Sequence, residues 1–470
     1  MAVSRKNFSV IFAVALISIV EYMALSTIDF NGLDYNGLIS TYAVIVFSNL
    51  VVQIIAMKLS GINMLSPIFI FIIFGYVFHF GQLLMNNIYE YDYLNYLDVY
   101  MSRDMTALLT TIKVCLSSLN AVFIGALIFM LFHGGKSEIS HHVEVEEFNE
   151  RQICYIVGIV LLIISTPFRL IIDATQMIAA MMGGYRGAIN AVSLPGVFSA
   201  VAGFWYSAML LVYIGKRRKS IFWIGIAYAT LSMLTGNRGH QITNILVMLM
   251  VYIHVEDIKP KLSKILKYGI LAYFFLIFID MIMNFRSVGI QGFFSDFGYY
   301  FTQSLQANII FETIGSFGET LYTPFLVIKQ MGNQLNPFIG EALIYSLGTL
   351  IPDIGGITSY TNVASNFAKM IDTQSAIGGS FVGDLYYNFR SGYWVVALLL
   401  GYLLCKYSDR YKQSINLKQY SKLIYYIPIF SNAFWWVRDS VGNEMRPLVW
   451  QIVISFAVVS IYKSKRTTNY

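Results

Sequence analysis

Long apolar stretches, separated by short polar segments, run through almost the whole chain. A helix that crosses a bilayer needs about 20 mostly apolar residues, with roughly 17–25 tolerated. The pattern therefore predicts an all-α, polytopic membrane protein with about 12 transmembrane helices. Several of the later stretches are short, so we expect those helices to extend into flanking loops, to tilt or to break. The predicted spans are 8–28, 38–57, 67–86, 110–132, 152–172, 194–214, 220–235, 240–255, 267–283, 392–405, 423–437 and 447–462.

The composition agrees with a membrane protein and excludes other classes. Hydrophobic residues make up 57% of the 470 residues and charged residues only 12%, whereas soluble chains carry about 25% charged residues. A soluble globular protein is therefore excluded, as is a disordered chain, which needs low hydrophobicity and high charge. The three cysteines and six histidines show no spacing typical of a disulfide framework or a metal site, and no phosphate-binding Walker loop is present. We expect neither a metal nor another cofactor.

Basic residues gather in alternate loops, and this asymmetry predicts an orientation. Lys and Arg accumulate in the cytoplasmic loops of membrane proteins. With the N-terminus placed inside, most of the 32 basic residues fall on the inner side, including the clusters at 216–219, 259–267 and 406–422. We therefore expect both termini to lie in the cytoplasm.

One long loop divides the predicted spans into two groups. Residues 284–391 fall on the outer side, are rich in Phe and Tyr, and include two apolar helical stretches, 305–330 and 338–351. A loop of this length is usually functional or disordered, and its aromatic content excludes disorder. We expect a large extracytoplasmic helical cap of amphipathic or re-entrant helices between a bundle at 1–283 and a bundle at 392–470. Alternatively, the two stretches form an extra hairpin of spans, which gives fourteen.

Arginines recur on the predicted outer side around the later spans. Charge near hydrocarbon is costly, so each arginine there needs a reason. Arginine stays protonated and presents a planar fork that matches phosphate. The alternative is that these residues anchor helix ends to lipid headgroups, or pair with neighbouring carboxylates. The residues are Arg238, Arg286, Arg390, Arg438 and Arg446, and to Arg390 we assign no specific role.

Three carboxylates in the predicted cap are candidates for a general base. Glu312 and Glu319 are seven residues apart and would share one face of a helix. Asp384 lies at the predicted mouth of the tenth span. A carboxylate in an apolar, arginine-rich site can take the proton of a sugar hydroxyl, or it can serve only as an arginine partner. Glu21 and His79 lie within predicted spans, and we interpret them as polar residues satisfied inside the bundle.

Aromatic side chains near these groups suit a carbohydrate. Tyr386 and Tyr387 follow Asp384 closely, and Trp435 ends the eleventh predicted span. Trp435 is most simply an interfacial belt residue, although tryptophan also stacks on sugar rings. Together with His240, these aromatic residues are the candidates for glycan contact. The arrangement predicts that arginines clamp a diphosphate, the cap covers a carbohydrate and the bundle holds a lipid tail.

In architecture and in short motifs the chain resembles the Wzy-type polymerases of bacterial O-antigen, enterobacterial common antigen and capsular repeat units. The architecture covers most of the chain, whereas the motifs are confined to its C-terminal half. The motif residues are Thr235–Gly239, Ile351-Pro352, Asn362–Phe367, Gly378–Ser380, Asp384, Tyr386–Phe389, Arg438-Asp439-Ser440 and Arg446.

The resemblance implies a metal-independent membrane glycosyltransferase with a GT-C-like fold, in the bacterial plasma (inner) membrane, with its active site facing the exterior. Such enzymes move a growing glycan from one undecaprenyl diphosphate carrier to the non-reducing end of a fresh lipid-linked repeat unit. Asp384 and Glu319 become the candidate bases, although many relatives have Glu where Asp384 stands. Arg238 and Arg438 are also catalytic candidates that stabilise the transition state. The diphosphate-binding set is Arg238, Arg286, Arg438 and Arg446.

The implied partners are the lipid-linked oligosaccharides that act as donor and acceptor, the bilayer, a chain-length regulator and a flippase, with no nucleic acid. One alternative is an O-antigen ligase-like glycosyltransferase, which uses the same donor but a different acceptor. Another is a polysaccharide transporter or flippase. Transporters usually show internal repeats and polar sites near the bilayer midplane. The chain shows no internal repeat, and its outer arginines lie at helix ends.

Overall fold

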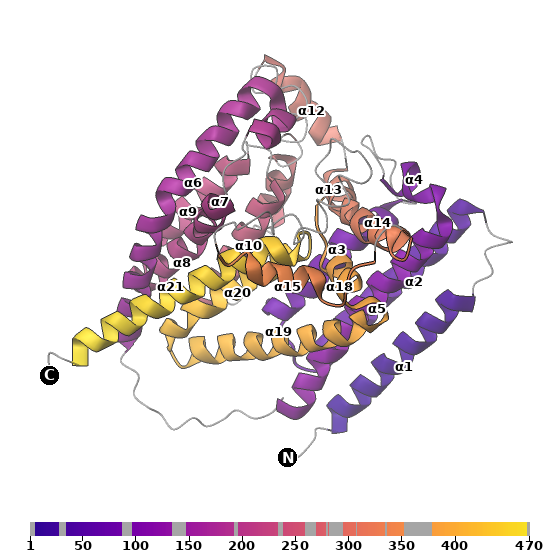
Figure 1. Cartoon of the computed structure of the whole chain (residues 1–470), viewed down its shortest axis with the longest axis horizontal. Coiled ribbons are helices and arrows are strands. Elements are labelled where there is room, and N and C mark those ends of the chain that lie inside the picture. The colour runs from indigo at the N-terminus through magenta and orange to yellow at the C-terminus, as the bar shows by residue number, and fades with distance from the viewer. Residues whose placement is uncertain are drawn as a thin grey trace. The chain divides into compact units, whose positions relative to one another are not determined.

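The computed structural model describes residues 5–27, 34–86, 96–133, 147–191, 196–233, 238–258, 269–278, 281, 295–306, 308–333, 336–351 and 378–467. Within these ranges the chain is helical and contains no β-strand (Figure 1). The α-helices are α1 (Arg5–Thr27), α2 (Tyr35–Leu59), α3 (Pro67–Met85), α4 (Tyr96–Val99), α5 (Met105–His133), α6 (Glu147–Ala191), α7 (Gly196–Ala202), α8 (Phe204–Lys216), α9 (Lys219–Ser232), α10 (Arg238–Val255), α12 (Phe297–Gln306), α13 (Ile309–Phe317), α14 (Tyr322–Gln330), α15 (Glu341–Gly348), α18 (Phe381–Phe389), α19 (Tyr393–Asn416), α20 (Leu423–Trp436) and α21 (Val441–Thr467). Another apolar helix covers Gly269–Phe278, and short 3-10 turns include η4 (Gly318–Leu321).

Local sequence explains where these helices begin. Asp34 precedes α2, and its side chain accepts a hydrogen bond from the backbone N–H of Gly37 at 2.9 Å. Ser66 caps α3 in the same way, and Pro67 occupies the first helical position, where a missing N–H has no cost. The apolar run that follows each cap then continues the helix, as the hydrophobic pattern predicts.

Six helices in the described part of the chain are long and apolar enough to cross a membrane. They are Tyr35–Leu59, Pro67–Met85, Met105–His133, Glu147–Ala179, Gly196–Lys216 and Val441–Lys465. The predicted all-α membrane class is therefore confirmed, whereas the count of 12 spans and the GT-C-like fold stay predictions. The stretches at 305–330 and 338–351 contain α13, η4, α14 and α15. That they form an external cap also stays a prediction.

The chain forms two compact units, which we describe separately. The first unit comprises Met1–His141, Ile314–Arg410 and Ala433–Met445, and the second comprises His142–Thr313, Tyr411–Asn432 and Arg446–Tyr470. Each unit therefore combines segments that are distant in the sequence. The three-part division expected from the loop at 284–391 stays a prediction.

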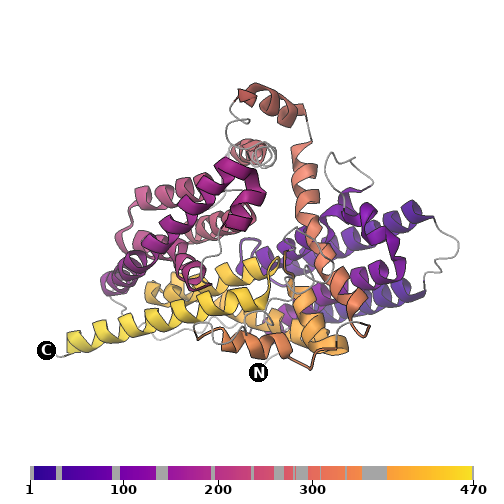
Figure 2. The ribbon, with the colours of Figure 1, turned by 45° about the horizontal axis from the view of Figure 1, so that its top comes forward.

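In the first unit, α1, α2, α3 and α5 pack against one another, and α14 and α18 pack on α5 (Figures 1 and 2). One close approach joins α3 to the segment of α13 and η4 through two facing glycines. A Cβ atom on Gly81 would overlap the carbonyl oxygen of Ile314, and one on Gly318 would overlap the backbone N of Gln82. The two backbones are therefore in direct contact, a packing that small residues allow between membrane helices.

In the second unit, α6 packs along α8 and α7, and α8, α9 and α10 pack in turn (Figure 2). The long helix α6 contains Pro167 in its interior and two ionisable residues, Arg169 and Asp173, in the following turns. Charged groups within an apolar helix of this kind must find partners on neighbouring helices.

Candidate functional site

The candidate site is built around the start of α18 in the first unit. Ser380 has an extended backbone and caps this helix, because its Oγ accepts the N–H of Gly383 at 3.2 Å. A Cβ atom on Gly379 would overlap the backbone of Asp439 and Ser440, so only glycine allows the chain to run this close. The hydroxyl of Thr323 in α14 donates to the carbonyl of Gly378. The Gly-Gly-Ser segment is therefore held by α14 and by the turn before α21.

His79 in α3 also holds this segment. Its Nδ1 lies 2.9 Å from the carbonyl oxygen of Gly75, and its Nε2 lies 2.7 Å from the Oγ of Ser380. A carbonyl oxygen can only accept, so Nδ1 carries the proton, and in the neutral ring Nε2 accepts the hydroxyl proton of Ser380. His79 is thus satisfied inside the bundle, as the sequence predicts, and it positions the cap of α18.

Asp384 lies in the first turn of α18 and is only 2% exposed. Its Oδ2 accepts hydrogen bonds from the indole Nε1 of Trp436 at 2.9 Å and from the backbone N–H of Val441 at 2.6 Å. Its Oδ1 accepts no hydrogen bond from a described residue. Burial raises the pKa of Asp384 to about 7, while the two hydrogen bonds lower the pKa and nearby Asp439 raises it.

Asp439 closes the turn between α20 and α21. Its Oδ2 accepts the indole N–H of Trp435 at 2.7 Å, and its Oδ1 accepts the backbone N–H of Ser440 at 2.6 Å and the side-chain amide of Asn443 at 2.7 Å. These bonds explain the local role of Asp439 without a hydrogen bond to Arg438. Arg438 interacts with Asp439 electrostatically, without a hydrogen bond between the two side chains.

Arg438 is half-buried in the same turn. Its guanidinium carbon lies 5.8 Å from the centroid of the Phe78 ring, and the side chain passes close to Gly378. Within the described part of the chain, this guanidinium makes no hydrogen bond and no ion pair. Its five N–H donors, close to an apolar ring, thus remain for a ligand.

Other predicted residues of the first unit have different surroundings. The hydroxyl of Tyr387 donates to Glu341 at 3.3 Å, and the ring of Tyr386 lies 5.8 Å from that of Tyr393. Arg390 donates to the carbonyl oxygen of Pro337 at 2.9 Å, which is consistent with a structural anchor.

Glu319 is half-buried at the start of η4, a 3-10 turn that follows α13. The α-helical register that we expected between Glu312 and Glu319 is therefore interrupted between them. The physical reason is the backbone contact at Gly318, where the tighter turn lies against α3.

The remaining arginine and histidine predictions belong to the second unit. Arg446 is buried beside Gly196, with its guanidinium carbon 5.8 Å from the Trp450 ring. Arg286 lies outside the described residues, and of Arg238 the structure describes only the backbone, as the first residue of α10. His240 is half-buried in the first turn of α10 and interacts electrostatically with Arg169. All these site assignments stay predictions.

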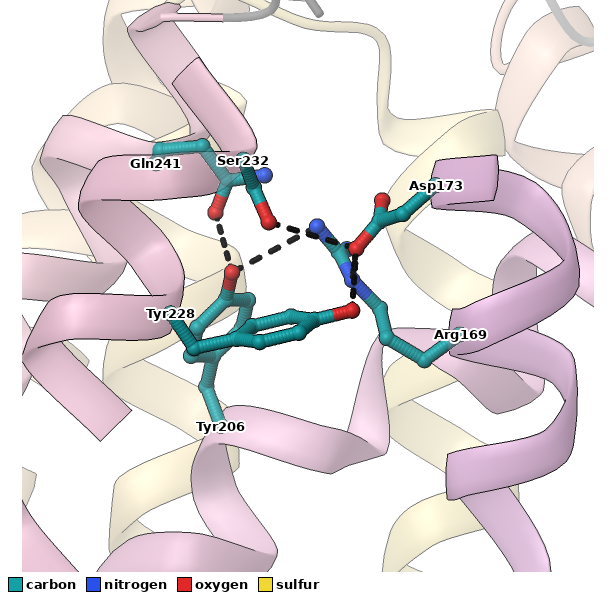
Figure 3. A network of polar contacts seen from close by, with 6 residues as sticks. All are labelled: Arg169, Asp173, Tyr206, Tyr228, Ser232 and Gln241. Carbon is teal, nitrogen blue, oxygen red and sulfur yellow. Dashed lines mark hydrogen bonds and ion pairs between the residues drawn. The ribbon is translucent and has the colours of Figure 1, made fainter. Parts of the chain in front are cut away.

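The structure also reveals a polar network that the sequence analysis missed. Arg169 and Asp173 in α6 form a partly buried ion pair surrounded by Tyr206, Tyr228, Ser232 and Gln241 (Figure 3). The signal in the sequence was an arginine and an aspartate four residues apart at the end of a predicted span. Trp436, like Trp435, has the sequence position of an interfacial belt residue, and no local pattern links it to Asp384.

The described residues contain no group of three or more His, Cys, Asp or Glu side chains that would hold a metal ion. The candidate site contains a buried carboxylate, a guanidinium without a hydrogen bond to a described residue, and aromatic rings. These are groups that move a proton and stabilise negative charge.

The fold defines a polytopic, all-helical membrane protein, and its candidate site contains a buried carboxylate and an arginine. The family model for the O-antigen polysaccharide polymerase Wzy matches residues 7–469, nearly the whole chain. The chain therefore belongs to the Wzy family of O-antigen polysaccharide polymerases, integral inner-membrane enzymes that act on lipid-linked repeat units. No curated protein and no solved structure gave a significant match. The predicted family is confirmed.

Proposed function

We propose that this protein polymerises undecaprenyl-diphosphate-linked repeat units by glycosyl transfer at the outer face of the plasma membrane. The family supports O-antigen as the product, and common-antigen or capsule-type polymers are variants of the same reaction. The observation that carries the proposal is the buried carboxylate of Asp384, whose two hydrogen-bond donors, Trp436 and Val441, lie on either side of Arg438 in the sequence. The segment 284–391 is proposed as the cap over this outer site.

Asp384 is proposed as the general base. It takes the proton from a hydroxyl at the non-reducing end of the acceptor, through the Oδ1 atom that no described residue uses. The hydroxyl oxygen then attacks the anomeric carbon of the donor, and the bond from that carbon to the diphosphate oxygen breaks. The lipid diphosphate leaves with the electron pair. A base works best with a pKa near the working pH, and the pKa of Asp384 is about 7. Glu319 is the second candidate for this role.

Arginines are proposed to stabilise the departing diphosphate. Fixed positive groups in a water-poor site stabilise charge as it develops, and this effect is often the largest in catalysis. Arg438 has the free donors for this task in the first unit, and Arg238, Arg286 and Arg446 complete the proposed set. His240, Tyr386, Tyr387 and Trp435 are proposed glycan contacts. Both termini are proposed to face the cytoplasm, and a flippase and a chain-length regulator are the proposed partners.

The test uses purified full-length protein in detergent or nanodiscs with lipid-diphosphate-linked repeat units as donor and acceptor. Wild-type protein should lengthen the glycan, and Asp384→Asn should lower the rate by about 10²–10⁴. Normal lengthening by Asp384→Asn at equal folded protein would overturn the base assignment.

The same assay tests the reaction class. Transfer only to an acceptor without a lipid diphosphate would indicate a ligase instead of a polymerase. Lengthening should continue after dialysis against a chelator, because the proposed mechanism uses no metal. Loss of activity that is restored by a divalent cation would contradict this part of the proposal.

A further inference from the structure

The ion pair between Arg169 and Asp173 is the strongest polar feature of the second unit. Arg169 is 7% exposed, and its Nε donates to Oδ2 of Asp173 at 2.8 Å. The same oxygen accepts the hydroxyl of Tyr228 at 2.5 Å and that of Ser232 at 3.2 Å (Figure 3). Arg169 lies on α6 with Asp173, whereas Tyr228 and Ser232 lie on α9. The carboxylate oxygen therefore links α9 to α6 at two points, one helical turn apart.

A second branch of the network reaches α8 and α10. The Nη2 of Arg169 donates to the hydroxyl of Tyr206 at 3.4 Å, and this hydroxyl donates to Oε1 of Gln241 (Figure 3). The guanidinium carbon also lies 5.2 Å from the Tyr206 ring centroid and 5.9 Å from that of Tyr228. Gln241 is only 2% exposed, so its side-chain oxygen depends on this contact.

The two branches hold the end of α9 and the first turn of α10, which together are called the α9–α10 junction. Ser232 is the last residue of α9, and Gln241 lies in the first turn of α10. Arg238 is the first residue of α10 and belongs to the Thr-Gly-Asn-Arg-Gly motif. The network that starts from one ion pair on α6 therefore contacts both the end of α9 and the start of α10.

An apolar contact would join these helices at a lower desolvation cost than a buried ion pair. The ion pair and its hydrogen bonds fix the relative position of the helices more tightly, because hydrogen bonds tolerate less displacement than apolar packing. The Oδ2 atom of Asp173 already has three donors, so the pair is better suited to holding protein groups than to binding a ligand itself.

We propose that the Arg169–Asp173 pair is a positioning pair for the α9–α10 junction, which it holds so that Arg238 meets the lipid diphosphate. This inference rests on the proposed function, because it takes Arg238 as a diphosphate ligand. Arg169 and Asp173 act through the junction and touch no substrate. A displacement of about 1 Å in a catalytic group lowers a rate up to 100-fold, so such a device affects catalysis directly.

The test is a double-mutant cycle on full-length protein, with Tyr228→Phe and Arg238→Ala measured singly and together. Tyr228→Phe removes one hydroxyl that holds Asp173 and should lower kcat about tenfold. Arg238→Ala should lower kcat by about 10²–10³. If the network acts through Arg238, the double variant should be no slower than Arg238→Ala alone, since the misplaced group is already absent.

Tyr252→Phe is the matched control in the same unit. The Tyr252 ring stacks on Phe222 at 4.3 Å, and its hydroxyl makes no hydrogen bond with a described residue. Its kcat should equal that of the wild type. Thermal unfolding of every variant shows whether each one is folded at the assay temperature. Ser232→Ala replaces Tyr228→Phe in the cycle if Tyr228→Phe does not fold.

The outcomes separate the two proposals. Normal kcat in Arg238→Ala would overturn the assignment of Arg238 within the proposed function, and the positioning role with it. A second outcome is that Arg238→Ala lowers kcat and the double variant lowers kcat by the product of the two single effects. This result would overturn the positioning role alone, because a purely structural network acts independently of Arg238. Normal kcat in both Tyr228→Phe and Ser232→Ala would also overturn it.

Discussion

The indole N–H of Trp436 donates to Oδ2 of Asp384 at 2.9 Å, although 52 residues separate them in the sequence. The backbone N–H of Val441 donates to the same oxygen at 2.6 Å. The turn between α20 and α21 therefore orients the carboxylate on α18 and leaves its other oxygen available. The same turn carries Arg438, so the candidate base and a candidate diphosphate ligand have fixed positions relative to one short segment.

The first prediction concerns the pH dependence of the reaction. A general base acts in its ionised form, and the pKa of Asp384 is about 7. The value of kcat/KM should therefore fall as the pH drops through about 7 and level off above it. The measurement is a profile of initial rates from about pH 5.5 to about pH 8.5. Asp384→Glu should retain activity, with the midpoint of its pH profile shifted. Asp384→Asn should have a low rate that does not change with pH around 7. A wild-type profile that is flat across the range would argue against Asp384.

The second prediction concerns stability. Burial raises the pKa of Asp384 from its ordinary value of 3.8 to about 7, so the folded state holds a proton that the unfolded state releases. The contribution of Asp384 to stability is thus fully present when the pH lies below the ordinary pKa, and it is lost as the pH rises through about 7. Asp384→Asn keeps the acceptor oxygen and removes the charge, so it should raise the midpoint of thermal unfolding more at about pH 8 than at about pH 5. Equal shifts at both values would contradict the proposed cause.

The third prediction concerns Arg438. Arg438→Ala should lower kcat by about 10²–10³, because a fixed cation at the departing diphosphate is lost. Arg438→Lys should have a kcat between those of the wild type and Arg438→Ala, since lysine keeps the charge but lacks the planar fork. Arg390→Ala is the matched control, because Arg390 is held by the Pro337 carbonyl in the same unit. Initial rates at saturating donor measure the difference. Equal rates in the two alanine variants would remove Arg438 from the site.

The fourth prediction concerns the cap of α18. Ser380→Ala removes the acceptor of the Gly383 N–H and the donor to His79, and should cost about 0.5–2 kcal/mol in stability. It should also lower kcat about tenfold, because Asp384 lies in the first turn of the same helix. Ser66→Ala removes the comparable cap of α3, where Ser66 accepts the N–H of Phe69 at 3.4 Å. That variant should lose stability with an unchanged kcat. If both variants lose only stability, the cap of α18 has no positioning role.

Much of the local structure was predictable from the sequence. The apolar runs predicted helices whose bounds agree closely with those of α2, α3 and α5, because the hydrophobic pattern and the capping residues act over a few neighbouring positions. The family and the membrane class followed from motifs and composition in the same way. Within the motif Gly378–Ser380, Gly379 makes a backbone contact that no other residue allows, which gives a physical reason for glycine at that position.

Other features depended on contacts between distant residues. Glu319 was expected to continue one helical face, but the backbone contact at Gly318 places it in a tighter turn. Arg169 and Asp173 lie at the end of a predicted span, and only the tertiary structure surrounds their ion pair with side chains from α8, α9 and α10.

The sequence by itself determined that this protein is a helical membrane polymerase and which short motifs carry its polar groups. Only the tertiary structure decided that Asp384 is buried against Trp436, that Arg438 keeps its donors free of hydrogen bonds to described residues and that Ser380 donates to His79. The physical reason is the distance along the chain over which each interaction acts. Hydrophobic periodicity and caps are local, whereas the desolvation of a carboxylate and the partners of a guanidinium depend on side chains that packing brings from elsewhere in the chain.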